Sequence, residues 1–156
     1  RDRPKATQFP GRLLAETITR QWRERTGTPL TYVGGAIVTV QEPTGPRNIA
    51  GAGQFTANNV AVYSPDRPHV IVNGELRLSP WIDAADLDRR GAVLLWQPHD
   101  KGLPENIKRA FPRAELQPPL VVPRHTLFPR RGELVHYAFI LPRPGPAPSA
   151  AGPVPR

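Results

Sequence analysis

The chain has 156 residues, a formal net charge of +8 and 21 prolines, but no cysteine. The lack of cysteine excludes disulfides, thiolate metal sites and thiol nucleophiles. No run of apolar residues is long enough for a membrane span, and no signal peptide is visible. Hydrophobic residues make up 38% of the chain, which is enough for a core, so we expect a soluble folded domain. Because it begins with Arg and contains no Met, we expect it to be excised or processed from a longer protein.

The first predicted element is an amphipathic helix over residues 10–26. Leu14, Ile18 and Trp22 recur every four residues, so they form one apolar stripe with charged residues opposite. Gly27 follows at the position where helices often end in a left-handed conformation.

The next segments are less regular. Residues 30–33 predict a short strand, which we expect Gly34 and Gly35 to end. Residues 36–52 fit either a hairpin arm or an inserted loop, and the sequence does not decide between them. Residues 53–63 fit a strand or a helix. We favour a helix, ended by the Ser-Pro pair that follows, because proline disfavours the α conformation of the residue before it.

The middle of the chain alternates strand and helix patterns. Residues 70–72 and 92–96 are continuous apolar runs, which are typical of strands covered on both faces. The aspartates of residues 83–86 can cap a helix that ends at Arg89 and Arg90, with Gly91 directly after it. Residues 104–111 predict another short helix.

The last third predicts two antiparallel strands near a sheet edge, the second over residues 134–141, followed by a Pro/Ala-rich disordered tail at 143–156. Residues 1–8 are expected to be a linker or disordered. Together the patterns predict one α/β domain over residues 9–142. The expected fold is a small three-layer α/β/α sandwich with a mainly parallel sheet and an antiparallel C-terminal hairpin.

Motifs for cofactors and metals are missing from the sequence. Neither GxGxxG nor GxxxxGK[ST] occurs, so no nucleotide cofactor is predicted. The histidines have no partner three or four residues away, so no metal site is predicted either; they are His69, His99, His125 and His136.

The best candidates for a ligand site lie after the predicted strands. His99 and Asp100 follow the strand 92–96, on the carboxyl edge where open α/β sheets tend to bind ligands. Gly34 and Gly35 leave the first strand at the same edge. These four residues are the candidates for ligand binding, and no catalytic residue is predicted.

The stretch YSPDRPHVIV, residues 63–72, raises a separate question. It has the side chains of a reactive site, but Ser64 and Asp66 are also common turn residues, and prolines fix the backbone around them. We favour a structural corner, with Arg67 pairing with Asp66 or with a helix carboxylate.

Four phrases carry a resemblance to a known family. They are FPGRLLAETITRQWRERTGTPLTYVGG, NNVAVYSPDRPHVIVNG, SPWIDAADLDRRGAVLLW and PENIKRAFPRAELQPPL. They resemble the C-terminal soluble region of bacterial membrane glycosyltransferases of family 39, relatives of the aminoarabinose transferases and protein mannosyltransferases. The resemblance runs from about residue 9 to 142. Residues 36–50 match less well, so we expect an insertion there.

The resemblance implies a parent enzyme whose multi-pass membrane part transfers a sugar from a polyprenyl-phosphate donor. The catalytic acidic residues of the family lie in that membrane part, and none can be placed on this sequence. This chain would then be a non-catalytic accessory domain on the periplasmic face of the bacterial inner membrane. Its partner would be its own membrane-embedded glycosyltransferase domain, with anionic lipid head groups or the polyprenyl-phosphate sugar as further candidates.

Two other functions remain open from the residues alone. One is a stand-alone α/β domain that binds a small ligand such as a nucleotide or a sugar phosphate. The other is a basic nucleic-acid-binding domain, but the arginines are scattered and neither an RNP pattern nor a helix-turn-helix is present.

Overall fold

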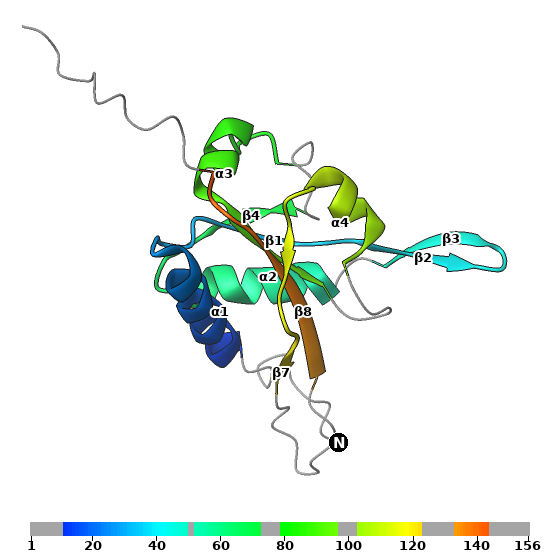
Figure 1. Cartoon of the computed structure of the whole chain (residues 1–156). Helices are drawn as coiled ribbons and strands as arrows, with labels where there is room; N and C mark the ends of the chain where they lie inside the picture. The colour runs from blue at the N-terminus through cyan, green and yellow to red at the C-terminus, as the bar shows by residue number, and fades with distance from the viewer. Residues whose placement is uncertain (1–10, 50–51, 73–78, 97–102, 123–132, 144–156) are drawn as a thin grey trace, which may run out of the picture.

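The computed structural model describes residues 11–49, 52–72, 79–96, 103–122 and 133–143. Within these ranges the chain is mixed α/β (Figure 1). The helices are α1 (Gly11–Thr26), α2 (Ala52–Tyr63), α3 (Ala84–Arg90) and α4 (Glu105–Ala110). The strands are β1 (Tyr32–Gly35), β2 (Val38–Glu42), β3 (Gly45–Ile49), β4 (His69–Ile71), β5 (Ala92–Trp96), β6 (Glu115–Leu116), β7 (Leu120–Val122) and β8 (Glu133–Ile140).

The main sheet has six strands in the order β4-β1-β5-β8-β6, and β7 also pairs with β8. β1 is parallel to both β4 and β5, whereas β8 is antiparallel to β5, β6 and β7. The sheet is therefore mixed, and the expectation of a mainly parallel sheet is not confirmed. The reason is that the neighbour of β5 on the side away from β1 is β8, which runs antiparallel to β5.

The C-terminal strands pair antiparallel as predicted, but their expected place at the edge is wrong for β8. β8 lies between β5 on one side and β6 and β7 on the other, and its Tyr137 and Phe139 are buried. β6 and β7 both pair with the outer side of β8 and are separated by a bulge. Leu116 pairs with Ala138 and Leu120 with Val135, so the three residues between Leu116 and Leu120 lie opposite two residues of β8. This bulge contains two prolines, which suits a sheet edge because proline cannot donate a ladder hydrogen bond.

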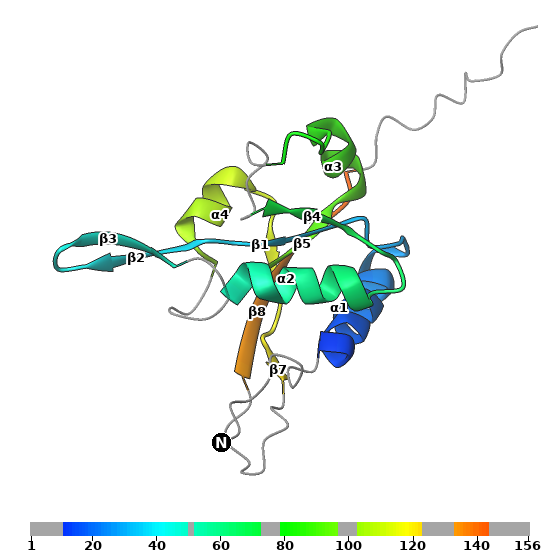
Figure 2. The same ribbon diagram turned by 180° about the vertical axis from the view of Figure 1, so that it is seen from behind.

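Apolar side chains pack on both faces of the main sheet, following the alternation of a strand. On one face α1 and α2 cover a cluster built from Leu14, Ile18, Trp22, Val33, Val60, Val93, Leu95 and Phe139. On the other face the residues of α3 and α4 join a second cluster that includes Leu87, Leu94, Trp96, Ile107, Ala138 and Ile140. In both views α1 and α2 lie below β1 and β4 and α3 lies above them, while α4 lies to the side at about their height, near the β2–β3 hairpin (Figures 1 and 2).

β2 and β3 resolve the open question about residues 36–52, because they form an antiparallel hairpin. The hairpin projects away from the main sheet (Figures 1 and 2). Glu42 pairs with Gly45, which leaves a two-residue turn between the strands, and Gly45 has a φ of 125°. The Arg47 Nε atom lies 2.7 Å from Glu42 Oε1 across the two strands.

All four helices occur where the sequence predicts them, but one further strand prediction, the end of β1, needs correction. β1 does not end before the glycines, because it runs through Gly34 and Gly35. A Cβ atom at Gly34 would lie 3.1 Å from a methyl of Leu94 and 3.2 Å from Ile71, so β1 packs tightly between its neighbours there. β4 is an edge strand, but Ile71 is buried on one face of the sheet and Val70 packs on the other, so the predicted cover on both faces is confirmed for β4 as well as for β5.

Candidate functional site

The ligand site predicted at the carboxyl edge of the sheet can be followed only in part. β1 and β5 are parallel and Gly35 is in register with Leu95, so their carboxyl ends lie side by side. The backbone N–H of Ala36 donates to the carbonyl of Leu95 at 2.8 Å. His99 and Asp100 lie outside the described residues. The binding role of these residues and of Gly34 and Gly35 stays a prediction.

The stretch that resembles a reactive site is built around Asp66. Its carboxylate is 3% exposed and accepts the backbone N–H of Leu30 at 2.8 Å. It also accepts both Nε, at 3.1 Å, and Nη2 of Arg23 on α1. Asp66 therefore ties the chain between α2 and β4 to α1 and to the segment that enters β1.

Asp66 belongs to a corner of the chain formed by residues 64–68, and hydrogen bonds hold other polar groups of this corner as well. The hydroxyls of Ser64 and Thr19 are 2.7 Å apart and buried, and Ser64 also accepts the backbone N–H of Asp66. The N–H of Arg67 donates to the Ser64 carbonyl at 3.1 Å, and Arg67 has a φ of 50°. Asp66 pairs with Arg23, so the first of the two pairings expected for Arg67, the one with Asp66, is not seen among the described residues.

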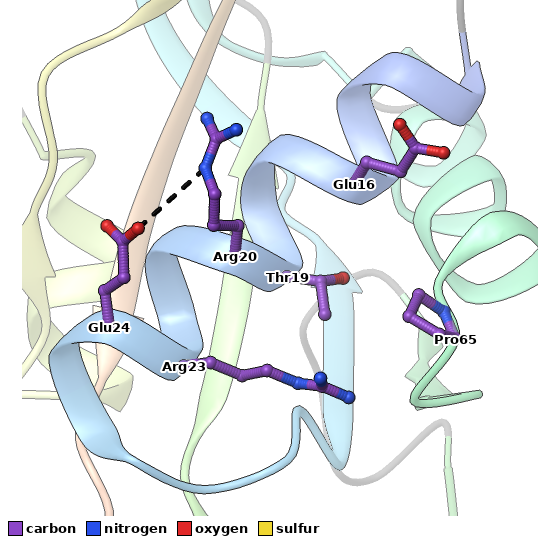
Figure 3. A pocket seen from close by; sticks show the side chains of 6 residues that line it. All are labelled: Glu16, Thr19, Arg20, Arg23, Glu24 and Pro65. Atoms are coloured by element: carbon purple, nitrogen blue, oxygen red, sulfur yellow. Dashed lines mark ion pairs between the residues drawn. The ribbon is translucent and has the colours of Figure 1, made fainter.

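A shallow groove of about 440 Å³ lies beside this corner (Figure 3). Its lining contains both acidic and basic side chains of α1, and Arg20 Nε is 4.0 Å from Glu24 Oε1. Figure 3 shows Pro65 facing the α1 side chains Thr19 and Arg23. Because Thr19 is engaged by a buried serine and Arg23 by Asp66, these groups hold the corner in place and do not pair as nucleophile and base.

A second polar cluster centres on Asp86 of α3. The Tyr32 hydroxyl donates to Asp86 Oδ2 at 2.5 Å, and Arg89 and Arg90 donate to Oδ1 at 2.5 and 2.9 Å. The tyrosine hydrogen bond, followed by those of the two arginines, lowers the pKa of Asp86 to about 2. Burial, followed by the contact with Asp86, raises the pKa of Tyr32 to about 12. The phenol thus stays protonated at neutral pH, which is unsuited to a base or nucleophile.

The described histidines lie far apart on the sheet. His69 is exposed at the start of β4, with its ring centroid 6.0 Å from that of Tyr32. His136 on β8 is half-buried beside Trp96, and burial lowers its pKa. No group of three metal-ligating side chains occurs among the residues that the structure describes. In the same part of the chain, no helix is both long and apolar enough to cross a membrane.

A third cluster was not anticipated from the sequence. Asp88 of α3 lies between Arg113, after α4, and Arg143, after β8. These residues border a second groove, between α3, the end of α4 and the end of β8. We call it the α3–α4 groove. Its charged residues come from three separate parts of the chain, so no local spacing signals it.

Comparisons of this chain with protein-family models, with curated proteins and with solved structures found no match.

Proposed function

We propose that this chain is a non-catalytic accessory domain of a membrane glycosyltransferase that takes a sugar from a polyprenyl-phosphate donor. In this proposal it lies on the periplasmic face of the bacterial inner membrane and contacts its own membrane-embedded part. It would adopt the three-layer α/β/α arrangement, for which the apolar clusters on both faces of the main sheet are the support.

The observation that carries the non-catalytic part of the proposal is the environment of Asp66. The most chemically suggestive phrase of the sequence, NVAVYSPDRP, is also one of the phrases that resemble the glycosyltransferase region. Its carboxylate is nearly fully buried and is bound to a backbone N–H and to Arg23. Such groups fix the path of the chain, so the phrase has a structural reason to be there without any reaction at this position.

A second phrase of the resemblance also coincides with a junction of the fold. SPWIDAADLDRRGAVLLW spans α3 and β5, and Asp83 caps α3 by accepting the N–H of Ala85 at 2.9 Å. The buried Ser79 hydroxyl accepts the N–H of Val72 at 2.8 Å, which links the start of the phrase to the end of β4. The resemblance therefore rests on residues that build the fold, which supports a shared architecture more than a shared reaction.

A substitution at the corner tests the structural role. Replacing Asp66 with Ala leaves the Leu30 N–H without its acceptor and removes the Arg23 pair, so we expect a loss of about 2 kcal/mol in the free energy of unfolding. Urea denaturation of the chain measures it. Glu24→Gln is the control, since its ion pair is exposed and 4.0 Å long and should contribute less than about 0.5 kcal/mol.

The same variant tests the function when it is made in the full-length protein. Sugar transfer from the polyprenyl-phosphate donor should fall only in proportion to the folded protein remaining in the membrane. A folded Asp66→Ala enzyme with transfer reduced a hundredfold would contradict the non-catalytic role. Sequencing the gene upstream of Arg1 tests the parent protein: we expect a series of hydrophobic spans, and a start codon directly before Arg1 would refute the proposal.

A further inference from the structure

The α3–α4 groove combines an apolar floor with a charged rim. It encloses about 340 Å³, which is at the lower end of the range for small-molecule sites. The floor is formed by Leu87 and Ile140, which are buried, and by the half-buried Phe111. Asp88, Arg113 and Arg143 stand at the rim. Figure 1 shows the end of β8 beside α3. The two are joined there by a backbone hydrogen bond, in which the N–H of Arg143 donates to the main-chain carbonyl of Asp88 at 2.9 Å.

The rim has more positive than negative charge. Two guanidinium groups share the single carboxylate of Asp88, so one positive charge remains uncompensated within the described lining. The two contacts also differ: Arg113 Nη2 lies 2.5 Å from Asp88, whereas Arg143 Nε lies 3.4 Å away. Arg143 is also the more exposed, at 59% against 37%. Asp88 therefore holds Arg113 firmly, while Arg143 can turn to another anion at little cost.

We propose that the α3–α4 groove binds a small amphiphile with an anionic head group. The head group pairs with Arg143 at the rim, and a short apolar chain lies on Leu87, Phe111 and Ile140. The groove has room for about eleven water-sized volumes of ~30 Å³, so it suits a chain of the length of an octyl group and not a long lipid tail. This inference concerns the domain itself and does not depend on the function proposed for the parent protein.

Both parts of the ligand are needed for the binding that we propose. A guanidinium binds carboxylate and phosphate alike through charge-assisted hydrogen bonds, so the head group can be either. The apolar chain adds the burial that a rim arginine alone cannot supply, because an ion pair surrounded by water contributes little, whereas a chain bound beside the pair excludes water from it and strengthens it. Inorganic phosphate should accordingly bind far more weakly than octyl phosphate.

Isothermal titration calorimetry of the full chain tests the inference, with octyl phosphate, octanoate, octanol and inorganic phosphate as probes below their micellar concentrations. We expect octyl phosphate or octanoate to bind at least tenfold more tightly than octanol and than phosphate. The difference between octyl phosphate and octanoate identifies the preferred head group. Arg143→Gln should lower the affinity for the more tightly binding probe about tenfold, which corresponds to about 1.4 kcal/mol in binding free energy.

Arg109→Gln is the matched control, because it removes the same charge from the exposed end of α4 without touching the groove. It should change the affinity less than twofold. Equal effects of the two variants would show that the binding depends on the net charge and not on the groove, which would overturn the proposal. Octanol binding as tightly as both anionic probes, or no binding by any probe, would overturn it too. A thermal melt of Arg143→Gln excludes unfolding as the cause of a lost signal.

Discussion

Asp86 shows how one carboxylate can join two elements. It accepts a phenol from β1 and two guanidinium groups from its own helix, and together these hydrogen bonds stabilise its charged form. Tyr32 is mostly buried, so its hydroxyl needs this acceptor inside the fold. The pair thereby fastens α3 to the face of the sheet that it covers.

The pH dependence of stability follows from the lowered pKa of Asp86. Its pKa is about 2 in the folded protein and about 3.9 in an unfolded chain. A lowered pKa adds stability that is complete above pH ~4 and disappears as the pH falls towards 2. Asp86→Asn should therefore be less stable than the wild type by about 1 kcal/mol at pH 7, a value limited by solvent screening, with the difference shrinking below pH 4.

Urea denaturation at several pH values between 2 and 7 measures this change. Glu24→Gln serves as the comparison, since its exposed ion pair of 4.0 Å should have little effect at any of them. A penalty for Asp86→Asn that stays constant across the whole range would show that the charge of Asp86 is not what fastens α3.

At the scale of elements, two helices end in the same way but in different surroundings. Gly27 after α1 and Gly91 after α3 have φ values of 71° and 75°, and each donates its N–H at 2.7 Å to the carbonyl four residues earlier. A Cβ atom at Gly27 would meet nothing within 4 Å. At Gly91 it would lie 2.2 Å from the Ile140 carbonyl oxygen and 2.8 Å from the ring of Trp22.

These two glycines make a matched pair of substitutions. Gly27→Ala should lower the free energy of unfolding by only about 1 kcal/mol, which is the strain of alanine in the left-handed backbone conformation. Gly91→Ala should lower the free energy of unfolding by about 3 kcal/mol or more, because the added Cβ atom would clash with the backbone. In addition, the ψ of −178° at Gly91 places it in a backbone region that is essentially restricted to glycine. Chemical denaturation of both variants measures the difference, and equal losses would mean that the α3–β5 junction is less tightly packed than the structure shows.

The elements that the sequence predicted well are those with local signals. The stripe of Leu14, Ile18 and Trp22 predicts α1, and the cap at Asp83 predicts the start of α3, because periodicity and capping depend only on nearby residues. The apolar run of β5 likewise predicts a central strand.

The elements that were misplaced depend on distant neighbours. Whether a strand lies inside the sheet or at its edge is decided by which strands pair with it, so apolar runs alone did not separate β4 at the edge from β8 inside. The two glycines of β1 resemble a strand end in the sequence, but the constraint on Gly34 is the close approach of Ile71 and Leu94 from the neighbouring strands, which local sequence does not show. The Tyr32–Asp86 contact and the α3–α4 groove join residues far apart in the chain, which spacing could not reveal.

At the scale of the whole molecule, the positive charge is unevenly divided. Twelve of the 21 Lys and Arg residues and ten of the 13 Asp and Glu residues lie in the described ranges, which leaves only two net positive charges there. Many of these bases face an acid within 4 Å, as in the clusters of Asp66, Asp86 and Asp88. The remaining net charge of the chain belongs to the other segments, and residues 123–132 contain Arg124, Arg130 and Arg131 but no acid.

This division predicts where the chain would contact an anionic surface. Each Lys or Arg near such a surface contributes about 1 kcal/mol, but a base already paired with a carboxylate contributes less. Replacing Arg124, Arg130 and Arg131 together with Gln should therefore abolish most of the sedimentation with phosphatidylglycerol vesicles at low salt. The control changes three bases that pair with a carboxylate in the described part of the chain, namely Arg20, Arg25 and Arg47, to Gln and should leave most of that binding intact.

The two triple variants carry the same net charge, so any difference between them reflects where the charge lies and not its amount. Binding of the wild-type chain should also fall at high salt and be weak on phosphatidylcholine vesicles, because exposed charges are screened over about 8 Å at physiological ionic strength. Equal losses in the two variants would mean that the three paired bases and residues 123–132 contribute alike to the binding. Equal binding of the wild type to neutral and anionic vesicles would remove the electrostatic contact altogether, and with it anionic lipid as a partner of this domain.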